Sequence, residues 1–243
     1  MSERSAAQQQ WSRGVAGLTA AERTVPLIPA FAALIPECRL RRGSVVACTG
    51  DGDVTLAVSV IAGASQDGAW VGIAGAPTIG CRAMAELGVD LGRVVLVAEP
   101  AGGFAGGQWG DVLAAMIDGF DVVLLGDRAP ALTPAAARKL QARLQSRGVV
   151  LVLAGSQGAF VADVQITGSH GRWLGLGAGH GVAVQRQLHV AVHGRRVARP
   201  QRRTVLAPGL DGCLEVPELI ELDQLGPDLV PTVAAGGGLA PTG

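Results

Sequence analysis

Short apolar segments alternate with amphipathic segments over the middle of this 243-residue chain. Runs such as Val94–Val97 and Val122–Leu125 are continuous and rich in valine and leucine, which is typical of strands that helices cover on both faces. The segments between them carry apolar residues at helical spacing. This order indicates an α/β domain with a mostly parallel sheet. The predicted strands are 44–49, 69–74, 93–98, 121–126 and 149–154, and the predicted helices are 54–65, 78–87, 108–118 and 134–146.

The pattern changes after residue 160, where strand-like stretches follow one another without intervening helices. Residues 161–167, 181–192 and 202–206 predict an antiparallel extension of the sheet. His189 and His193 stand four apart on one of these strands, so their side chains point to the same face. No third ligand accompanies the two imidazoles. We therefore interpret them as exposed polar residues and expect no metal site.

The two ends of the chain differ from its middle. Residues 1–40 predict an N-terminal helical arm, which packs on its own domain or on a neighbouring subunit. Residues 41–210 form the predicted core domain, and residues 1–210 together hold 20 basic and 14 acidic residues and hence a net charge of +6. Residues 211–243 hold six acidic residues and no basic residue, and end in VAAGGGLAPTG. Such a composition predicts a flexible tail that interacts with a partner.

This charge distribution suggests two interaction sites. A group of arginines near residue 200 could contact nucleic-acid phosphates weakly, pair with the acidic tail or remain solvated. Its members are Arg195, Arg196, Arg199, Arg202 and Arg203. The tail carries apolar residues suited to binding in a partner's groove, with folding back onto its own domain as the alternative. The predicted anchors are Leu214, Val216, Leu219, Ile220, Leu222 and Leu225.

The predicted strand–turn–helix at residues 44–64 stands where nucleoside triphosphatases carry the phosphate loop G-x-x-x-x-G-K-[ST]. Only one residue separates Gly50 from Gly52, whereas four are needed to surround a phosphate with backbone N–H groups. Asp53 replaces the lysine, and Val54 replaces the hydroxyl that holds magnesium, with Thr55 next in the chain. A carboxylate repels a triphosphate. The segment therefore predicts an ATPase scaffold that has lost ATP binding, with no cofactor.

The cysteines and the hydropathy of the chain predict its compartment. The four cysteines, Cys38, Cys48, Cys81 and Cys213, have no C-x-x-C spacing, which argues against a zinc site or a disulfide framework. No apolar run approaches the ~18 residues of a membrane helix, and the N-terminus has no apolar signal core. We therefore expect a cytoplasmic protein that does not contact a membrane.

Several sequence blocks resemble the core of the RecA recombinase over residues 41–167, namely GSVVACTG, LGVDLGRVVLV, DVVLL and ALTP. Within the RecA-like superfamily the chain most resembles the ImuA-prime family of actinobacterial mutagenesis proteins. The narrower likeness lies in PAFAALIPECRLRRGSVVACTG and in SHGRWLGLGAG followed by GVAVQRQLHVAVHGRR. The resemblance implies a RecA-like three-layer core with a mostly parallel central sheet and an antiparallel extension.

The chain departs from RecA at three further positions that handle nucleotide. The position of the water-activating glutamate falls near Ala76, and that of the aromatic residue that stacks on adenine falls near Ala83. The magnesium-linked aspartate falls at Gly126, with Asp127 shifted by one residue. Because phosphoryl transfer depends on positioning and charge neutralisation, these losses imply a degenerate ATPase that is not an enzyme.

The two DNA-binding loops of RecA are also short or absent here. Residues 135–140 continue directly into a predicted helix after the ALTP block. Ser156 and Gln157 are followed by only a few residues before the strand predicted from Val161. The chain is therefore not expected to bind single-stranded DNA in a RecA-style filament.

The ImuA-prime resemblance implies a non-catalytic accessory protein of DNA-damage-induced translesion synthesis and mutagenesis. Its implied partners are an ImuB-type Y-family polymerase homologue and an error-prone C-family DNA polymerase complex, with association with the nucleoid when engaged. One alternative is a SulA-type cell-division inhibitor that binds FtsZ, which is also a RecA core without ATP binding. A surviving ATPase or recombinase is a third hypothesis, and the phosphate loop argues against it.

Overall fold

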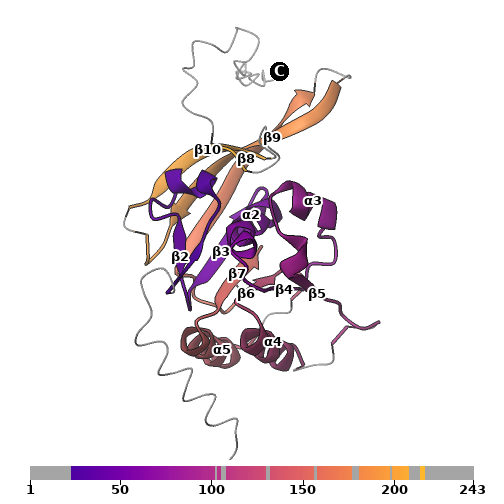
Figure 1. The fold of residues 1–243 in the computed structure, drawn as a ribbon, viewed down its shortest axis with the longest axis vertical. Helices are drawn as coiled ribbons and strands as arrows, with labels where there is room; N and C mark the ends of the chain where they lie inside the picture. Colours follow the sequence, from indigo (N-terminus) through magenta and orange to yellow (C-terminus); the bar gives the residue numbers. More distant parts are fainter. Residues whose placement is uncertain are drawn as a thin grey trace, which may run out of the picture.

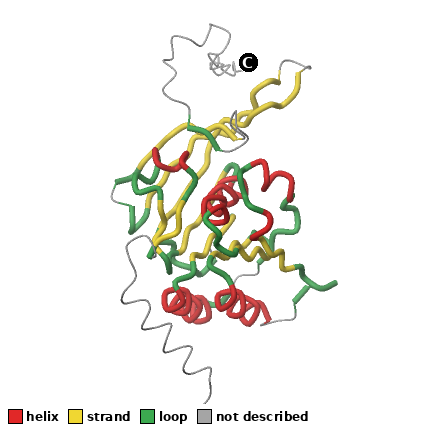
Figure 2. Tube along the Cα trace, viewed as in Figure 1, coloured by secondary structure: helices red, strands yellow, loops and turns green. Residues whose placement is uncertain are grey.

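The large sheet has eight strands in the order β10-β9-β8-β3-β7-β6-β4-β5, and a second, two-stranded sheet pairs β1 with β2. Helices cover both faces of the large sheet, with α2 and α3 on one side and α4 and α5 on the other (Figures 1 and 2). This is the predicted three-layer arrangement. The computed structural model describes residues 23–101, 103–104, 108–129, 132–155, 158–176, 181–197, 199–207 and 214–216.

The parallel part of the sheet confirms the strands and helices predicted between residues 44 and 154. The elements are β3 (Val45–Gly50), α2 (Asp53–Gln66), β4 (Val71–Ala74), α3 (Cys81–Glu86), β5 (Val94–Val97), α4 (Gln108–Gly119), β6 (Val122–Leu125), α5 (Pro134–Arg147) and β7 (Val150–Ala154). The residues at the two ends of helix α5 explain why its bounds could be predicted from the sequence. The Thr133 hydroxyl caps its start by accepting from the Ala136 N–H, and Gly148, with φ of 70°, ends it.

Strand β6 shows why the predicted strands are continuous apolar runs. Val122 and Leu124 contribute to the core beneath α2 and α3, while Val123 and Leu125 contribute to the core beneath α4 and α5. Successive side chains of a strand point to opposite faces, so a sheet with helices on both faces needs apolar residues at every position.

The antiparallel extension consists of β8 (Val164–Leu176), β9 (Gly181–His193) and β10 (Gln201–Ala207). Strand β8 lies parallel to β3 and antiparallel to β9, which in turn lies antiparallel to β10. The first strand begins later than the predicted residue 161 and runs to Leu176, so the β8–β9 hairpin projects beyond the body of the domain (Figure 1). The sequence GSHGRWLGL obscured this part because glycines and a bulge interrupt its alternation.

The N-terminal segment differs from the predicted helical arm. Residues 24–26 and 39–41 are strands, β1 (Thr24–Pro26) and β2 (Arg39–Arg41), with a short 3-10 helix, η1 (Pro29–Ala33), between them. The strands are too short to show alternation, and prolines at 26 and 29 hid them. Phe31 and Leu34 of this segment pack on the core, and both are fully buried. Residues 1–22 lie outside the described residues, so docking of the arm stays a prediction.

Candidate functional site

The junction between β3 and α2 is the first candidate site, and its turn is very tight. Strand β3 ends at Gly50 and α2 begins at Asp53. Gly50 has φ of 78° and Gly52 has φ of 71°, a left-handed conformation that favours glycine. The two glycines therefore serve to close a sharp turn, and they do not frame a longer phosphate-binding loop.

Strand β8 lies directly against this turn. The Asp51 N–H donates to the Gly168 carbonyl oxygen at 2.9 Å, and the Asp51 carboxylate accepts from the Gly171 N–H at 3.0 Å. A Cβ added to Gly50 would lie 2.2 Å from the Gly168 oxygen, and one added to Gly168 would lie 2.0 Å from the Asp51 oxygen. The neighbouring strand thus contacts the turn where a phosphate loop needs an open concavity.

A carboxylate of the protein itself, that of Asp53, lies at the start of helix α2. The Asp53 carboxylate accepts a hydrogen bond from the Val54 N–H at 2.7 Å. Free N–H groups at a helix start are what bind phosphate in nucleotide-binding proteins. Here an internal carboxylate takes one of them, and Val54, which is 41% exposed, offers no ligand to a metal ion. Thr55 is half-buried behind it.

The other positions that correspond to nucleotide-handling residues of RecA lack side chains that could serve in that role. Gly126 is so close to the β4 end that an added Cβ would lie 2.7 Å from the Ala76 Cβ. Ala83 is exposed on α3. A Cβ added to Gly155 would lie 3.5 Å from an Asp53 carboxylate oxygen and 3.4 Å from the Asp127 Cβ. Two carboxylate residues therefore border this end of the sheet, where they would repel a polyphosphate.

Cys48 lies at the end of β3, next to this junction, and is fully buried. Burial raises the pKa of its thiol, and the nearby Asp53 carboxylate raises that pKa further. The thiol is therefore protonated at neutral pH, which disfavours a role as a nucleophile.

The predicted absence of a metal site can be examined only in the part of the chain that the structure describes. There, no group of three or more His, Cys, Asp or Glu residues could hold a metal ion. His189 and His193 are exposed on β9, as predicted, and the His189 Nδ1 lies 3.2 Å from the Thr204 hydroxyl. Among the same residues, no helix is both long and apolar enough to cross a bilayer.

The arginine group predicted to contact DNA is divided by the structure. Arg195 and Arg196 both form ion pairs with Asp163, at 3.2 and 3.1 Å. The Asp163 side chain is only 4% exposed, and its second oxygen accepts from the Val45 N–H at 3.0 Å. These two arginines thus hold the β9–β10 connection against β3. The sequence did not predict Asp163 as the partner of these arginines.

The remaining arginines of the group are exposed. Arg202 and Arg203 lie on β10, and the Arg203 guanidinium donates to the Arg202 carbonyl oxygen at 2.7 Å. Arg199 lines a pocket described next. Contact of these residues with DNA stays a prediction.

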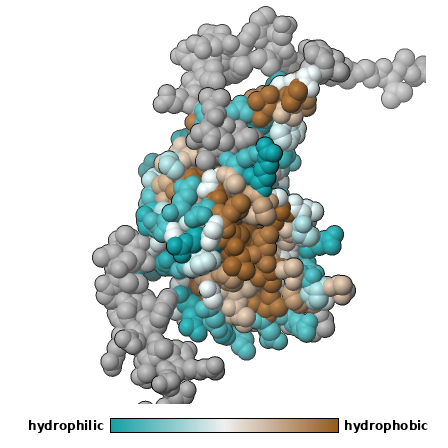
Figure 3. All heavy atoms as spheres, turned by 45° about the vertical axis from the view of Figure 1, so that its right-hand side comes forward, coloured by the Kyte–Doolittle hydropathy of each residue, from teal (hydrophilic) through white to brown (hydrophobic). Residues whose placement is uncertain are grey.

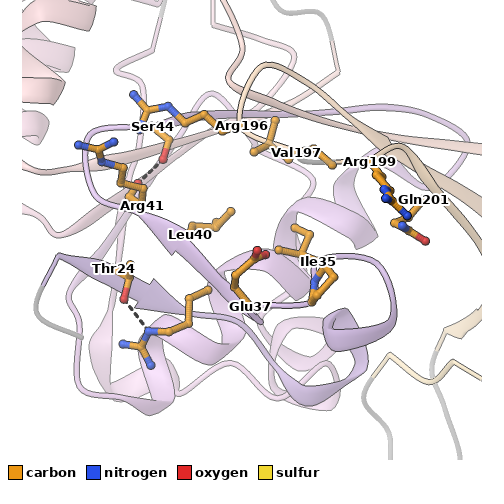
Figure 4. A pocket seen from close by; sticks show the side chains of 13 residues that line it. Thr24, Ile35, Glu37, Leu40, Arg41, Ser44, Arg196, Val197, Arg199 and Gln201 are labelled. Atoms are coloured by element: carbon orange, nitrogen blue, oxygen red, sulfur yellow. Dashed lines mark hydrogen bonds between the residues drawn. The ribbon is translucent and has the colours of Figure 1, made fainter. Parts of the chain in front are cut away.

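A pocket of about 660 Å³ lies between the N-terminal segment and the connection from β9 to β10. Figure 4 shows Arg41 and Arg196 on one side of it, Arg199 and Gln201 on the other, and Leu40 between them. We call it the basic pocket. Its charged lining residues are Arg39, Arg41, Arg196, Arg199 and Glu37, and its apolar lining residues are Ile35, Pro36, Leu40, Val164 and Val197. This site could not be predicted from the sequence, because its two halves lie far apart along the chain, although Arg39, Arg41 and Arg42 form a local basic cluster.

The beginning of the predicted tail belongs to the core. Leu214 is 3% exposed, and Val216 packs against the same hydrophobic cluster. Glu215 and Leu206 exchange two backbone hydrogen bonds, of 2.8 and 2.9 Å. The prediction that Leu214 and Val216 anchor a partner is therefore wrong, because they fold back on their own domain. The other predicted anchors, Leu219, Ile220, Leu222 and Leu225, lie outside the described residues.

Two apolar surfaces remain exposed among the described residues (Figure 3). One lies at the outer end of the β8–β9 hairpin, and the other lies on the side of the body where β5 is the edge strand. Exposed apolar patches of this kind often contact other proteins. The exposed residues are Trp173, Leu176, Val182 and Val184 on the hairpin, and Trp70, Leu91, Val95 and Leu96 near β5.

The fold is that of a RecA-like α/β domain, in which strand β8 contacts the short turn between β3 and α2. The model of the MT3502 N-terminal domain family matches residues 33–159, and the chain belongs to this family.

Two further comparisons found a relative in sequence and a solved structure of similar fold. The chain is 34% identical over 99 residues to the uncharacterized protein Rv3395c of Mycobacterium tuberculosis (strain ATCC 25618 / H37Rv). That match covers 41% of this chain and 46% of the relative, so the chain spans about half the length of the protein it matches. The crystal structure of the KaiC-like protein PH0186 from Pyrococcus horikoshii OT3 has a TM-score of 0.56 and 17% sequence identity, and the match covers 81% of this chain and 99% of that one. This likeness shows the RecA-like fold.

Proposed function

We propose that this protein is a non-catalytic RecA-like accessory protein of DNA-damage-induced translesion synthesis and mutagenesis. The short turn at Gly50–Asp53, with its internal carboxylate, is the observation that carries the non-catalytic part of the proposal. The sequence likeness to the ImuA-prime family supports the pathway.

In this role the protein is an adaptor, and its activity lies in its surfaces. It joins an ImuB-type Y-family polymerase homologue to an error-prone C-family DNA polymerase. Two features support an adaptor. The domain exposes two apolar surfaces, and the chain continues after Val216 into a segment with both apolar and acidic residues. An acidic, apolar segment suits a groove with a basic rim on a partner protein.

We expect affinity purification of the full chain from DNA-damaged cells to recover both polymerase proteins. Replacing Leu219, Leu222 and Leu225 by serine should reduce recovery at least tenfold, because loss of three apolar anchors typically costs several kcal/mol of binding. A matched control is Leu229→Ser with Val233→Ser, which changes apolar residues further along the same segment. An equal loss of recovery in the control would show that Leu219, Leu222 and Leu225 are not the residues that anchor the partner. Recovery of FtsZ in place of the polymerase proteins would show a cell-division inhibitor instead.

A further inference from the structure

The basic pocket carries positive charge that its surroundings only partly neutralise. Four arginines and one glutamate line it. Arg196 is paired with Asp163. Within the described ranges, no carboxylate forms an ion pair with Arg41 or Arg199, and both are exposed at the pocket rim. The pocket therefore favours a ligand that brings carboxylates, because guanidinium groups bind these through charge-assisted hydrogen bonds.

The pocket also has an apolar wall, which narrows the choice of ligand. Ile35, Leu40 and Val197 contribute aliphatic side chains between the arginines (Figure 4). Nucleic-acid phosphates would use the arginines alone. A peptide that alternates acidic and branched aliphatic residues would use both parts of the lining.

The sequence of this chain itself contains such a peptide. Residues 217–226 read PELIELDQLG, with three carboxylates and four leucine or isoleucine side chains. The core around the pocket is positive, whereas the chain from residue 211 onward has no basic residue. The two are therefore complementary in charge and in apolar character.

The direction of the chain also favours this occupant. Strand β10 runs from Gln201 to Ala207, and Glu215 pairs with Leu206 in the antiparallel sense, so residues 214–216 lead back toward Gln201. Gln201 lines the pocket. The five positions from Leu206 to Gln201 correspond to about 17 Å of strand, and ten extended residues reach about 33 Å. Pro217 has no N–H with which to continue pairing along β10, which favours a segment that leaves the strand edge.

We propose that residues 217–226 of this chain occupy the basic pocket in the free protein. The carboxylates of Glu218, Glu221 and Asp223 meet the pocket arginines, and the aliphatic residues between them meet the apolar wall. Because the segment is tethered at Glu215, its effective concentration at the pocket is on the order of millimolar, so weak contacts suffice. This contact does not depend on the proposed function. If the same segment binds a polymerase homologue, that partner must displace it from the pocket.

The experiment uses the full chain with a photo-reactive benzophenone amino acid at position 201, on the pocket wall. Irradiation is expected to cross-link this position to residues 217–226 of the same molecule, as identified by mass spectrometry. Arg41→Glu with Arg199→Glu should reduce the yield at least tenfold. Reversing the charge of the tail, by Glu218→Lys, Glu221→Lys and Asp223→Lys, should reduce the yield to the same extent. Combining the pocket and tail substitutions should restore the cross-link. The matched control is Arg202→Glu with Arg203→Glu, which reverses two exposed arginines outside the pocket and should leave the yield unchanged.

Each other outcome overturns the proposal. Cross-linked species of twice the mass would show that a second copy occupies the pocket. A cross-link to nucleic acid that nuclease treatment removes would show a nucleic-acid site. If no cross-link forms between position 201 and residues 217–226 after irradiation, the segment does not occupy the pocket. Circular dichroism of the variants checks folding, and failure of polymerase binding in the earlier purification would leave this result unaffected.

Discussion

Replacing Phe31 by alanine is expected to lower the free energy of unfolding by about 3–5 kcal/mol. The Phe31 side chain has 0% exposure and belongs to the same core as α2 and the sheet. Helix α2 approaches this segment so closely that a Cβ added to Gly63 would lie 2.4 Å from the Leu27 carbonyl carbon. The surrounding backbone therefore has little freedom to collapse into the space that Phe31 leaves, which favours a large effect.

Urea denaturation followed by circular dichroism measures this effect. Val182→Ala is the control, because Val182 is 75% exposed and its loss should change stability by less than about 0.5 kcal/mol. If Phe31→Ala cost under about 1 kcal/mol, the packing of the N-terminal segment would contribute little to the stability of the core.

The second large effect is expected from Asp163→Ala, at about 3 kcal/mol. This change leaves the Val45 N–H without its hydrogen bond and two arginines without their counter-charge. Removing one partner of a buried ion pair typically costs 3–5 kcal/mol. The lower end of that range is expected because the Arg195 side chain is 64% exposed and can be hydrated after the change.

Asp118→Ala is the matched control for Asp163→Ala. Asp118 also pairs with two arginines, Arg143 and Arg147, but at the surface. Its loss should cost about 0.2–1 kcal/mol. The hydrogen bond from Arg143 holds the pKa of the Asp118 carboxyl below its ordinary value, despite partial burial. Its contribution is therefore present above the unfolded-state pKa and disappears as the pH falls through the folded-state pKa. Equal costs for the two substitutions would contradict a buried anchoring role for Asp163.

The parallel half of the fold could be predicted because its signals are local. The runs at Val122–Leu125 and Val150–Ala154 are apolar at every position, and Thr133 and Gly148 mark the ends of α5. The short turn between β3 and α2 could also be predicted, because Gly50 and Gly52 stand only one residue apart between an apolar run and a helical pattern.

The parts that sequence reasoning missed depend on contacts between distant residues. Asp163 lies 32 and 33 positions from the arginines that it binds, and 118 positions from Val45. The closing of the turn by Gly168 likewise depends on the register of β8 against β3. Leu214 was predicted to anchor a partner because the sequence does not distinguish an apolar residue that packs in its own core from one that packs against another protein.

Calorimetry with magnesium and ATP is the most direct test of the proposal that the short turn at Gly50–Asp53 does not bind nucleotide. We expect no hydrolysis and no binding tighter than ~1 mM, which corresponds to about −4 kcal/mol. Asp53→Lys supplies the missing positive charge while leaving the turn short and in contact with Gly168. This variant should also fail to bind, because the backbone cradle is absent. Micromolar affinity for ATP in the natural sequence would contradict the account.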